Sequence, residues 1–193
     1  IVSVSSGLIG IETLTLTGEV NTNNANVGSF SASGGTLNVG STTINIANGS
    51  NGGLAANYAI NDGNFTITQR PVGVSGTRLY DATTNAVASD LSTHANLVGS
   101  ETLTLSGTGT IASKDVGSNK TVSVGTLALG NGSNGGLAGN YTLTGGTHQL
   151  TVNQRPLNAT LARQYDGTTA AAGSTLSSFD ALQGGETLTM TGS

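Results

Sequence analysis

The sequence has 193 residues, of which 35% are hydrophobic and only 8% are charged, and its formal net charge is −4. A typical soluble domain is roughly 25% charged, so here Ser, Thr, Asn and 30 glycines supply the polar surface instead. Six basic residues cannot form the positive stripe of a nucleic-acid-binding protein. No apolar run approaches the roughly 18 residues of a membrane span, and the lack of cysteine excludes disulfides and thiolate metal sites.

Short alternating runs of Val, Ile, Leu and Thr predict β-strands along the chain. In the first ETLTL run, Leu14 and Leu16 lie on one strand face and threonines on the other. Further strands are expected in the second ETLTL run and at residues 42–47, 65–68, 121–125 and 149–152. Gly, Asn and Asp separate these runs, which is typical of a β-sandwich or a partly open β-roll. A single helical turn is expected after YDGTTAAA, with Asp166 or Thr168 as its cap.

A glycine-rich stretch occurs twice, as NGSNGGLAANY at Asn48–Tyr58 and as NGSNGGLAGNY at Asn131–Tyr141. A phosphate-binding loop would need a Lys followed by Ser or Thr, and then a helix. Neither copy has them, whereas Asn and Gly tolerate the positive φ angles of tight turns. We therefore interpret both copies as turns, and we expect Leu54 with Tyr58, and Leu137 with Tyr141, to pack behind them.

The chain repeats itself with a period of about 85 residues. QRP begins at Gln69 and Gln154, Tyr-Asp begins at Tyr80 and Tyr165, and ETLT begins at Glu12, Glu101 and Glu186. We therefore divide the chain into the rear part of one repeat (1–70), a complete repeat (71–155) and the front part of the next (156–193). The simplest expectation is a piece of a longer tandem array.

The QRP motif marks the expected junction between repeats. The apolar positions change their odd/even phase across it, from Phe65 and Ile67 before the motif to Val72 and Val74 after it. A phase change turns the apolar side of a strand to the opposite face, and proline cannot donate to a central ladder. One extended segment is thus expected to end one sheet and begin the next, giving a semi-rigid string of domains.

The Tyr-Asp motif is the first candidate for chemistry, with Arg163, Tyr165 and Asp166 as members. Because it recurs around Tyr80, we favour a structural interpretation: a buried ring, an Asx turn and an arginine that caps the carboxylate. A residue needed once per folding unit recurs in this way, whereas a single active site would not.

The other ionisable residues give weaker signals. Glu101 and Arg155 are candidates for an ion pair, and His94 and His148 are expected at the surface or in loops. There is no HExxH motif and no acidic calcium loop, so the only metal chemistry left open is weak calcium binding. Asp62 and Asp115 are the candidates for it, and several N-x-S/T triplets matter only if a glycosylating pathway meets the protein. We expect no catalytic, cofactor-binding or metal-binding residues.

The chain resembles the YDG-type repeats of large bacterial filamentous-haemagglutinin-like adhesins. The stretches that carry the resemblance are RQYDGTTAAAGSTLSSFDALQGGETLTMTG, DVGSNKTVSVGTLALGNGSNGGLAGNYTL and LTVNQRPL. Such repeats are often mixed with MBG repeats. The chain departs from the pattern in YDATT at Tyr80 and in NVG at Asn26, which affects structural motifs only. The resemblance implies secretion, a place in an adhesin stalk or extracellular fibre, and no catalytic residues.

Together these observations predict an all-β chain of small tandem domains, sandwich-like or β-grasp-like, strung into an extended rod or filament. The expected function is structural: a stalk or self-assembling fibre outside a bacterial cell, active in attachment and biofilm matrix. Expected partners are copies of the chain and glycans or matrix. The alternative is a carbohydrate-binding or ice-binding module, which exposed, coplanar threonines at Thr13 and Thr15 would favour. An enzyme is the least favoured class, since no unique acid–base pair is present.

Overall fold

A computed structural model describes residues 7–17, 24–33, 36–37, 45–59, 62–169 and 176–189. The chain divides into two compact units, residues 1–69 and residues 70–193, called here the N-terminal and C-terminal units. The first segment predicted from the sequence ended at residue 70, one residue later than the N-terminal unit.

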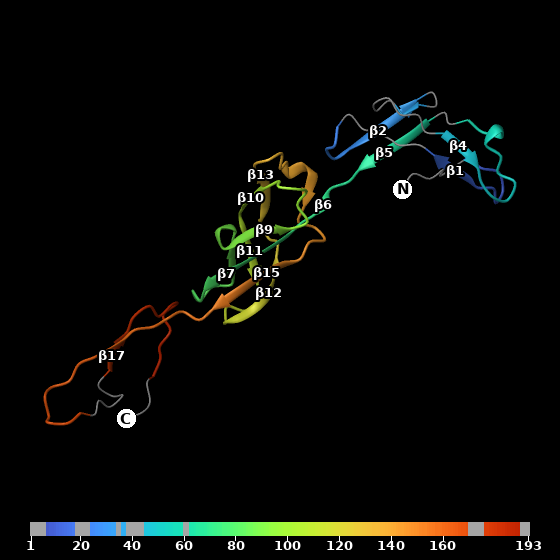
Figure 1. Cartoon of the computed structure of the whole chain (residues 1–193). Helices are drawn as coiled ribbons and strands as arrows, with labels where there is room; N and C mark the ends of the chain where they lie inside the picture. The colour runs from blue at the N-terminus through green and yellow to red at the C-terminus, as the bar shows by residue number, and fades with distance from the viewer. Residues whose placement is uncertain are drawn as a thin grey trace. The chain divides into compact units, whose positions relative to one another are not determined.

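The described residues form an all-β protein, as predicted (Figure 1). The strands of the N-terminal unit are β1 (Leu14–Thr17), β2 (Gly28–Ser33), β3 (Thr36–Leu37), β4 (Asn45–Asn48) and β5 (Asp62–Ile67). Those of the C-terminal unit are β6 (Arg70–Pro71), β7 (Gly73–Leu79), β8 (Asn85–Val87), β9 (Leu91–Ala95), β10 (Leu103–Ser106), β11 (Thr108–Ile111), β12 (Gly117–Ser123), β13 (Ala128–Asn131), β14 (Tyr141–Thr142), β15 (His148–Asn153), β16 (Ala159–Leu161) and β17 (Leu176–Phe179).

Helical structure in the described residues is limited to three short 3-10 turns. They are η1 (Ala55–Asn57), η2 (Ala88–Asp90) and η3 (Ala138–Asn140). In this part of the chain there is accordingly no helix of the length and apolar character that crossing a membrane requires. The helical turn expected after YDGTTAAA would begin at residues 170–175, which lie outside the described residues.

The complete repeat is built on one six-stranded sheet with the order β8-β11-β12-β15-β7-β9. Two neighbouring strands in this order, β15 and β7, are parallel, with six residue pairs in register from His148↔Val74 to Asn153↔Leu79. Their outer neighbours are antiparallel to them. The edge strands β8 and β9 are joined only by η2, so the sheet curls until its two edges approach each other and it is nearly closed, like a barrel.

Alternating burial of side chains along β7 and β15 shows where the core lies. In β15, Leu150 and Val152 are 0% and 1% exposed, and Val74 in β7 is 1% exposed. The residues between them on each strand point the other way. The remaining core members lie on other strands of the C-terminal unit and in the loops between them: Val72, Ala86, Leu91, Ile111, Val122, Leu127, Tyr141 and Leu143. Small aliphatic side chains dominate, in keeping with a narrow sheet interior.

The N-terminal unit repeats part of this design. Its strands β2 and β5 pair antiparallel, from Gly28↔Ile67 to Ser33↔Asp62, as β12 and β15 do in the complete repeat. Likewise β1 pairs with β4, as β10 pairs with β13. The predicted strands in both ETLTL runs and at FTIT, TVSVG and QLTV are thus confirmed, whereas in TTINIA only residues 45–47 lie in described structure.

The QRP junctions are extended. After β5 the chain passes to β6, which pairs in parallel with β14, and then enters β7. After β15 it runs through residues 154–158 into β16, which pairs with β17. At the first QRP the chain thus runs from strand to strand, as the phase change predicts, whereas residues 154–158 at the second QRP lie in no strand.

Candidate functional site

The glycine-rich stretch folds as a loop that closes over the ETLT strand. In the C-terminal unit, the Ser133 carbonyl accepts the Thr102 N–H at 3.1 Å, and the Thr102 hydroxyl accepts the Ser133 N–H at 2.7 Å. The Asn131 side chain accepts the Ala138 N–H, and the Asn134 side chain donates to the Ser100 carbonyl. The N-terminal unit has the same bonds, from Thr13 with Ser50 and from Asn48 and Asn51. We call this arrangement the loop–strand clamp.

The composition of the loop follows from this geometry. Asn134 and Gly135 have φ angles of 55° and 87°, a conformation that Asn and Gly adopt most readily. A Cβ atom at Gly132 or Gly136 would overlap the Thr102 carbonyl oxygen, because strand and loop are in backbone contact there. The turn interpretation is confirmed: the loop amides and carbonyls bind their own strand.

Each clamp ends in a tyrosine that binds the glutamate of ETLT. The Tyr141 hydroxyl donates to the Glu101 carboxylate at 2.5 Å and accepts the Val98 N–H at 3.1 Å. In the N-terminal unit, Tyr58 donates to Glu12 and accepts the Ile9 N–H at 3.3 Å. The sequence did contain a signal for this pair, because each repeat carries one such glutamate and one such tyrosine.

These contacts change the acid–base properties of both phenols. Burial, and then the hydrogen bond to Glu101, raise the pKa of Tyr141. The hydrogen bond to Glu12 raises the pKa of Tyr58. Both phenols therefore keep their protons to a higher pH than a free tyrosine does, which suits a hydroxyl that donates a structural hydrogen bond.

The leucines of the loop do not behave as predicted. Leu54 and Leu137 are 51% and 40% exposed, so the expectation that they pack behind the turn is wrong. Each immediately precedes a 3-10 turn, and that turn directs the following tyrosine inward instead. Tyr141 is only 3% exposed.

The threonines of the ETLTL runs are exposed, but in the C-terminal unit their hydroxyls have partners. Thr102 bonds Ser133, and Thr104 donates to the Asn131 carbonyl at 3.3 Å. Hydroxyls already bound within the strand pair are less suited to a regular ice-binding array. The structure does not strengthen that alternative.

The Tyr-Asp motif forms a second recurring arrangement, the Arg–Asp–Thr motif. Asp81 accepts the Thr83 N–H at 2.9 Å and pairs with Arg78, whose guanidinium also donates to the Thr83 carbonyl at 2.7 Å. This is the predicted Asx turn with a capping arginine. The Arg78 residue is only 8% exposed, although its Nε has no hydrogen-bond partner among the described residues.

The second copy has the same bonds but a different environment. Asp166 accepts the Thr168 N–H at 2.9 Å and pairs with Arg163. The bond from Thr168, and then that from Arg163, lower the pKa of Asp166. Tyr165 is 96% exposed, so the buried ring predicted for this copy is absent. The strands that surround the first copy have no counterpart around the second in the described residues.

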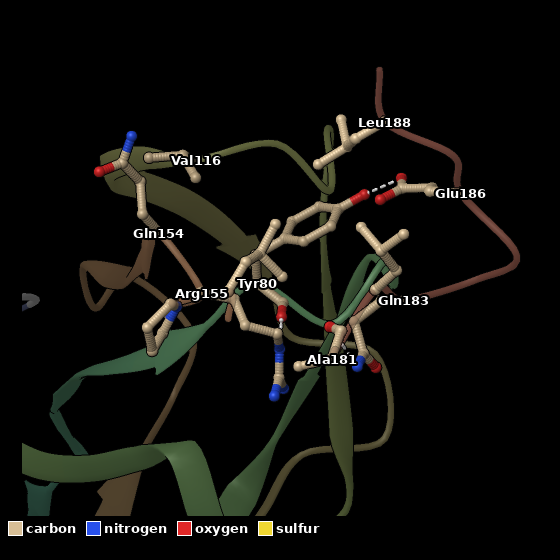
Figure 2. Close-up of a pocket in the computed structure, with 11 residues that line it drawn as sticks. Tyr80, Val116, Gln154, Arg155, Ala181, Gln183, Glu186 and Leu188 are labelled. Atoms are coloured by element: carbon tan, nitrogen blue, oxygen red, sulfur yellow. Dashed lines mark hydrogen bonds between the residues drawn. The ribbon is translucent and has the colours of Figure 1, made fainter. Parts of the chain in front are cut away.

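Tyr80 joins the complete repeat to the segment that follows it. Figure 2 shows its ring pointing toward Glu186, to which the hydroxyl donates. Lys114 binds the same carboxylate at 2.6 Å, and its Nζ lies 5.6 Å from the centre of the Tyr80 ring. We call Tyr80, Lys114 and Glu186 the junction cluster. The hydrogen bonds from Lys114 and then Tyr80 lower the pKa of Glu186, while the Glu186 carboxylate raises that of Lys114.

An open hollow surrounds this cluster. Residues 154–157 at the second QRP line one side of it, and residues between 181 and 188, which include part of the third ETLT run, line the other (Figure 2). Leu188 is 54% exposed and Val116 is 51% exposed there, and the Arg155 Nε donates to the Tyr80 carbonyl at 2.7 Å. Because Lys114 and Tyr80 both bind the Glu186 carboxylate, the hollow lies over a contact between the six-stranded sheet and the segment that follows it.

Two further predictions about ionisable residues are wrong. Glu101 binds Tyr141 and Arg155 binds the Tyr80 carbonyl, so these two do not form the suggested ion pair. His148 is not at the surface: it lies in β15, is 8% exposed, and its Nε2 is 2.8 Å from the Leu143 carbonyl oxygen. His94 lies in β9.

No metal site is evident in the part of the chain that the structure describes. No group of three His, Cys, Asp or Glu side chains is gathered there. Asp115, a candidate for weak calcium binding, accepts the Ser113 hydroxyl at 2.6 Å, and Asp62 lies in β5.

The comparison with known families agrees with this architecture. Residues 64–151 match the YDG domain family. The chain contains a YDG domain. The match begins in β5 and ends within β15, at residue 151, so it takes in the second loop–strand clamp, the first Arg–Asp–Thr motif and all of the six-stranded sheet except the last two residues of β15. The expected resemblance to YDG-type repeats is confirmed. Searches of curated proteins and of solved structures returned no match.

Proposed function

We propose that the YDG domain is a load-bearing repeat in the stalk or fibre of a secreted bacterial surface adhesin. In this proposal, tandem β-grasp-like repeats of about 85 residues form an extended rod outside the cell. The rod serves attachment and biofilm matrix, and its partners are copies of itself, glycans or matrix. Catalysis has no part in it.

The observation that carries the proposal is the parallel pairing of β7 with β15. These are the first and the last strands, in chain order, of the six-stranded sheet, and six residue pairs join them. Because the strands are parallel, the start of β7 and the end of β15 lie at opposite ends of the pair. Tension along the chain therefore shears all their hydrogen bonds together, whereas antiparallel neighbours would open one bond at a time.

The recurring contacts support the same role. The loop–strand clamp is built from equivalent residues in both units, and the junction cluster binds Glu186 of the following segment to the YDG domain. In this proposal such contacts hold neighbouring repeats together. The family match to YDG domains supports the adhesin context by analogy only.

Antibodies raised against the chain test the cellular part of the proposal. We expect them to label intact cells of the source bacterium and, in immunogold images, thin fibres at the cell surface. The matched control is the same serum depleted on the purified chain. Labelling that requires permeabilised cells would contradict the proposal.

A further inference from the structure

The sequence contains six N-x-S/T triplets, the acceptor motif for N-linked sugars, which begin at Asn48, Asn64, Asn119, Asn131, Asn140 and Asn158. A transferase that recognises the motif binds two groups at once, the side-chain amide of the asparagine and the hydroxyl of the third residue. A triplet of the folded chain is therefore open to the enzyme only where both groups are exposed and have no other hydrogen-bond partner.

Both clamp triplets are closed to such an enzyme. In the C-terminal unit the Asn131 side chain accepts the Ala138 N–H at 2.8 Å, and the Ser133 and Thr102 hydroxyls are bonded to each other at 2.8 Å. The triplet that begins at Asn48 has the same two bonds in the N-terminal unit. To enter a transferase, either triplet would have to open its clamp.

Two more triplets have a third residue that is already engaged. Asn140 is half-buried, and the hydroxyl of Thr142 accepts a backbone N–H at 3.1 Å. Asn158 is exposed, but its third residue, Thr160, lies in β16 and has an interaction partner of its own. The side chain of Asn64 lies outside the described residues. Neither Asn140 nor Asn158 thus meets both conditions.

The triplet at Asn119 differs from these in its position and its bonding. Asn119 lies in β12 at a β-bulge, where the register with β15 shifts between Gly117 and Lys120, and its φ angle is 50°. A bulge turns a side chain out of the regular ladder, while the Asn119 N–H holds the backbone by donating to the Thr151 hydroxyl at 3.2 Å. Asn119 and Thr121 are both exposed, and neither side chain has a hydrogen-bond partner among the described residues.

We propose that Asn119 is a site at which a sugar is attached to the YDG domain, by a transferase that binds Asn119 and Thr121 and uses a nucleotide-activated sugar. The Asn119 Nδ2 atom attacks the anomeric carbon, and the new C–N bond forms as the C–O bond to the diphosphate breaks. The nucleoside diphosphate leaves, and Nδ2 gives one proton to a base of the transferase. The product is compatible with the fold, because no hydrogen bond of the core or of the clamp is lost.

The neighbouring strands offer groups that bind sugar hydroxyls. In the two ladders beside the site, Thr121 lies opposite Gln149, and Thr151 lies opposite Thr77. Thr77 is exposed, and Gln149 and Thr151 are half-buried. Their hydroxyl and amide groups can hydrogen-bond a sugar without the cost of removing a charge from water. A sugar on Asn119 would therefore lie beside a surface of matching polarity.

Transfer of a sugar to the folded, full chain tests the selection. The chain is incubated with a transferase specific for the N-x-S/T motif and its nucleotide-sugar donor, and the tryptic peptides are then weighed. We expect the peptide from Asp115 to Lys120, whose only asparagine is Asn119, to carry sugar. Its modified fraction should exceed that of Asn131 by at least about tenfold, since two hydrogen bonds of the clamp must open before Asn131 can react.

Matched controls separate the fold from the enzyme. Thr121→Ala should abolish the transfer to Asn119 and Thr121→Ser should retain it, and because Thr121 is exposed both variants should unfold in urea as the parent does. Synthetic peptides of equal length around Asn119 and Asn131 should be modified at similar rates. Equal modification of both asparagines in the folded chain, or a tenfold preference already present in the peptides, would overturn the inference.

The chain isolated from the source bacterium gives the second measurement. Its peptide from Asp115 to Lys120 should be heavier by the mass of at least one sugar, and a peptide without sugar in this material would overturn the inference. The modification goes beyond the proposed load-bearing role and does not depend on it. An unmodified Asn119 would leave the surface labelling of intact cells unaffected, so the two ideas can fail separately.

Discussion

Replacing Tyr141 by phenylalanine removes one hydroxyl from the loop–strand clamp and leaves the ring, which is 3% exposed, in place. The hydroxyl donates to Glu101 and accepts the Val98 N–H. A hydrogen bond to a charged group contributes about 1.5–3 kcal/mol and a neutral one about 1 kcal/mol. Because Glu101 is only partly buried and water can replace the phenol, we take the lower end of the first range. The expected loss is about 2 kcal/mol of unfolding free energy.

The assay is urea unfolding of the full chain, followed by hydrogen exchange in peptides from the YDG domain. Tyr58→Phe is the matched control, since it removes the same bonds from the N-terminal unit and should leave the YDG peptides unchanged. A Tyr141→Phe variant within about 0.5 kcal/mol of the parent, the usual size of a neutral surface change, would refute the structural value assigned to the Glu–Tyr bond.

The effect of Tyr141→Phe on the free energy of unfolding should also depend on pH. The pKa of Tyr141 is raised in the folded state, so its contribution is complete below the unfolded value of about 10 and is lost as pH rises through the raised value. The parent should therefore lose more stability than Tyr141→Phe as pH rises above about 10, and the difference in unfolding free energy between the two should narrow. A gap that stays constant over this range would contradict the assignment.

Three further predictions concern the core, the loop and the junction. Leu150→Ala, at a position 0% exposed, should cost the YDG domain about 3 kcal/mol in urea unfolding. Gly136→Ala should cost about 2 kcal/mol or more because its Cβ overlaps the strand backbone, whereas Gly139→Ala, whose Cβ meets nothing within 4 Å, should be nearly neutral in the same assay. The contact of residues 181–188 with Tyr80 and Lys114 should be present above the usual Glu pKa of 4.5 and lost as pH falls through the lowered pKa of Glu186. Hydrogen exchange of this segment should show the loss in the parent. In Glu186→Gln the contact should be weaker, and by the same amount at every pH.

Much of the fold could be predicted from the sequence because it is set locally. Alternation identified both ETLTL strands and β15, and the Asn-Gly content identified the loop. Recurrence also identified Asp81 with Arg78 as structural, whereas it did not lead to the bond between Glu101 and Tyr141, although each of these residues recurs with the repeat. Repetition separates residues that maintain a fold from those that perform one reaction.

The parallel pair could not be predicted. β7 and β15 are separated by most of the repeat, and nothing in either strand specifies its partner or register. His148 was misplaced for a related reason: a polar side chain on the inward face of β15 is acceptable only because the Leu143 carbonyl is there to bind it. The exposure of Leu54 and Leu137 depends on the 3-10 turn that follows each, which local hydrophobicity does not reveal.

Pulling on the YDG domain in two directions tests its load-bearing role most directly. Cysteine handles at Pro71 and Gln154 shear the β7–β15 pair, whereas handles at Leu79 and Asn153, which lie opposite each other in the register, peel it open. We predict one cooperative rupture in shear, at several times the peeling force, with a gain in length of roughly 250 Å as the chain between the handles extends. Equal forces in the two directions, or gradual extension without a discrete step, would contradict the load-bearing role of the parallel strands.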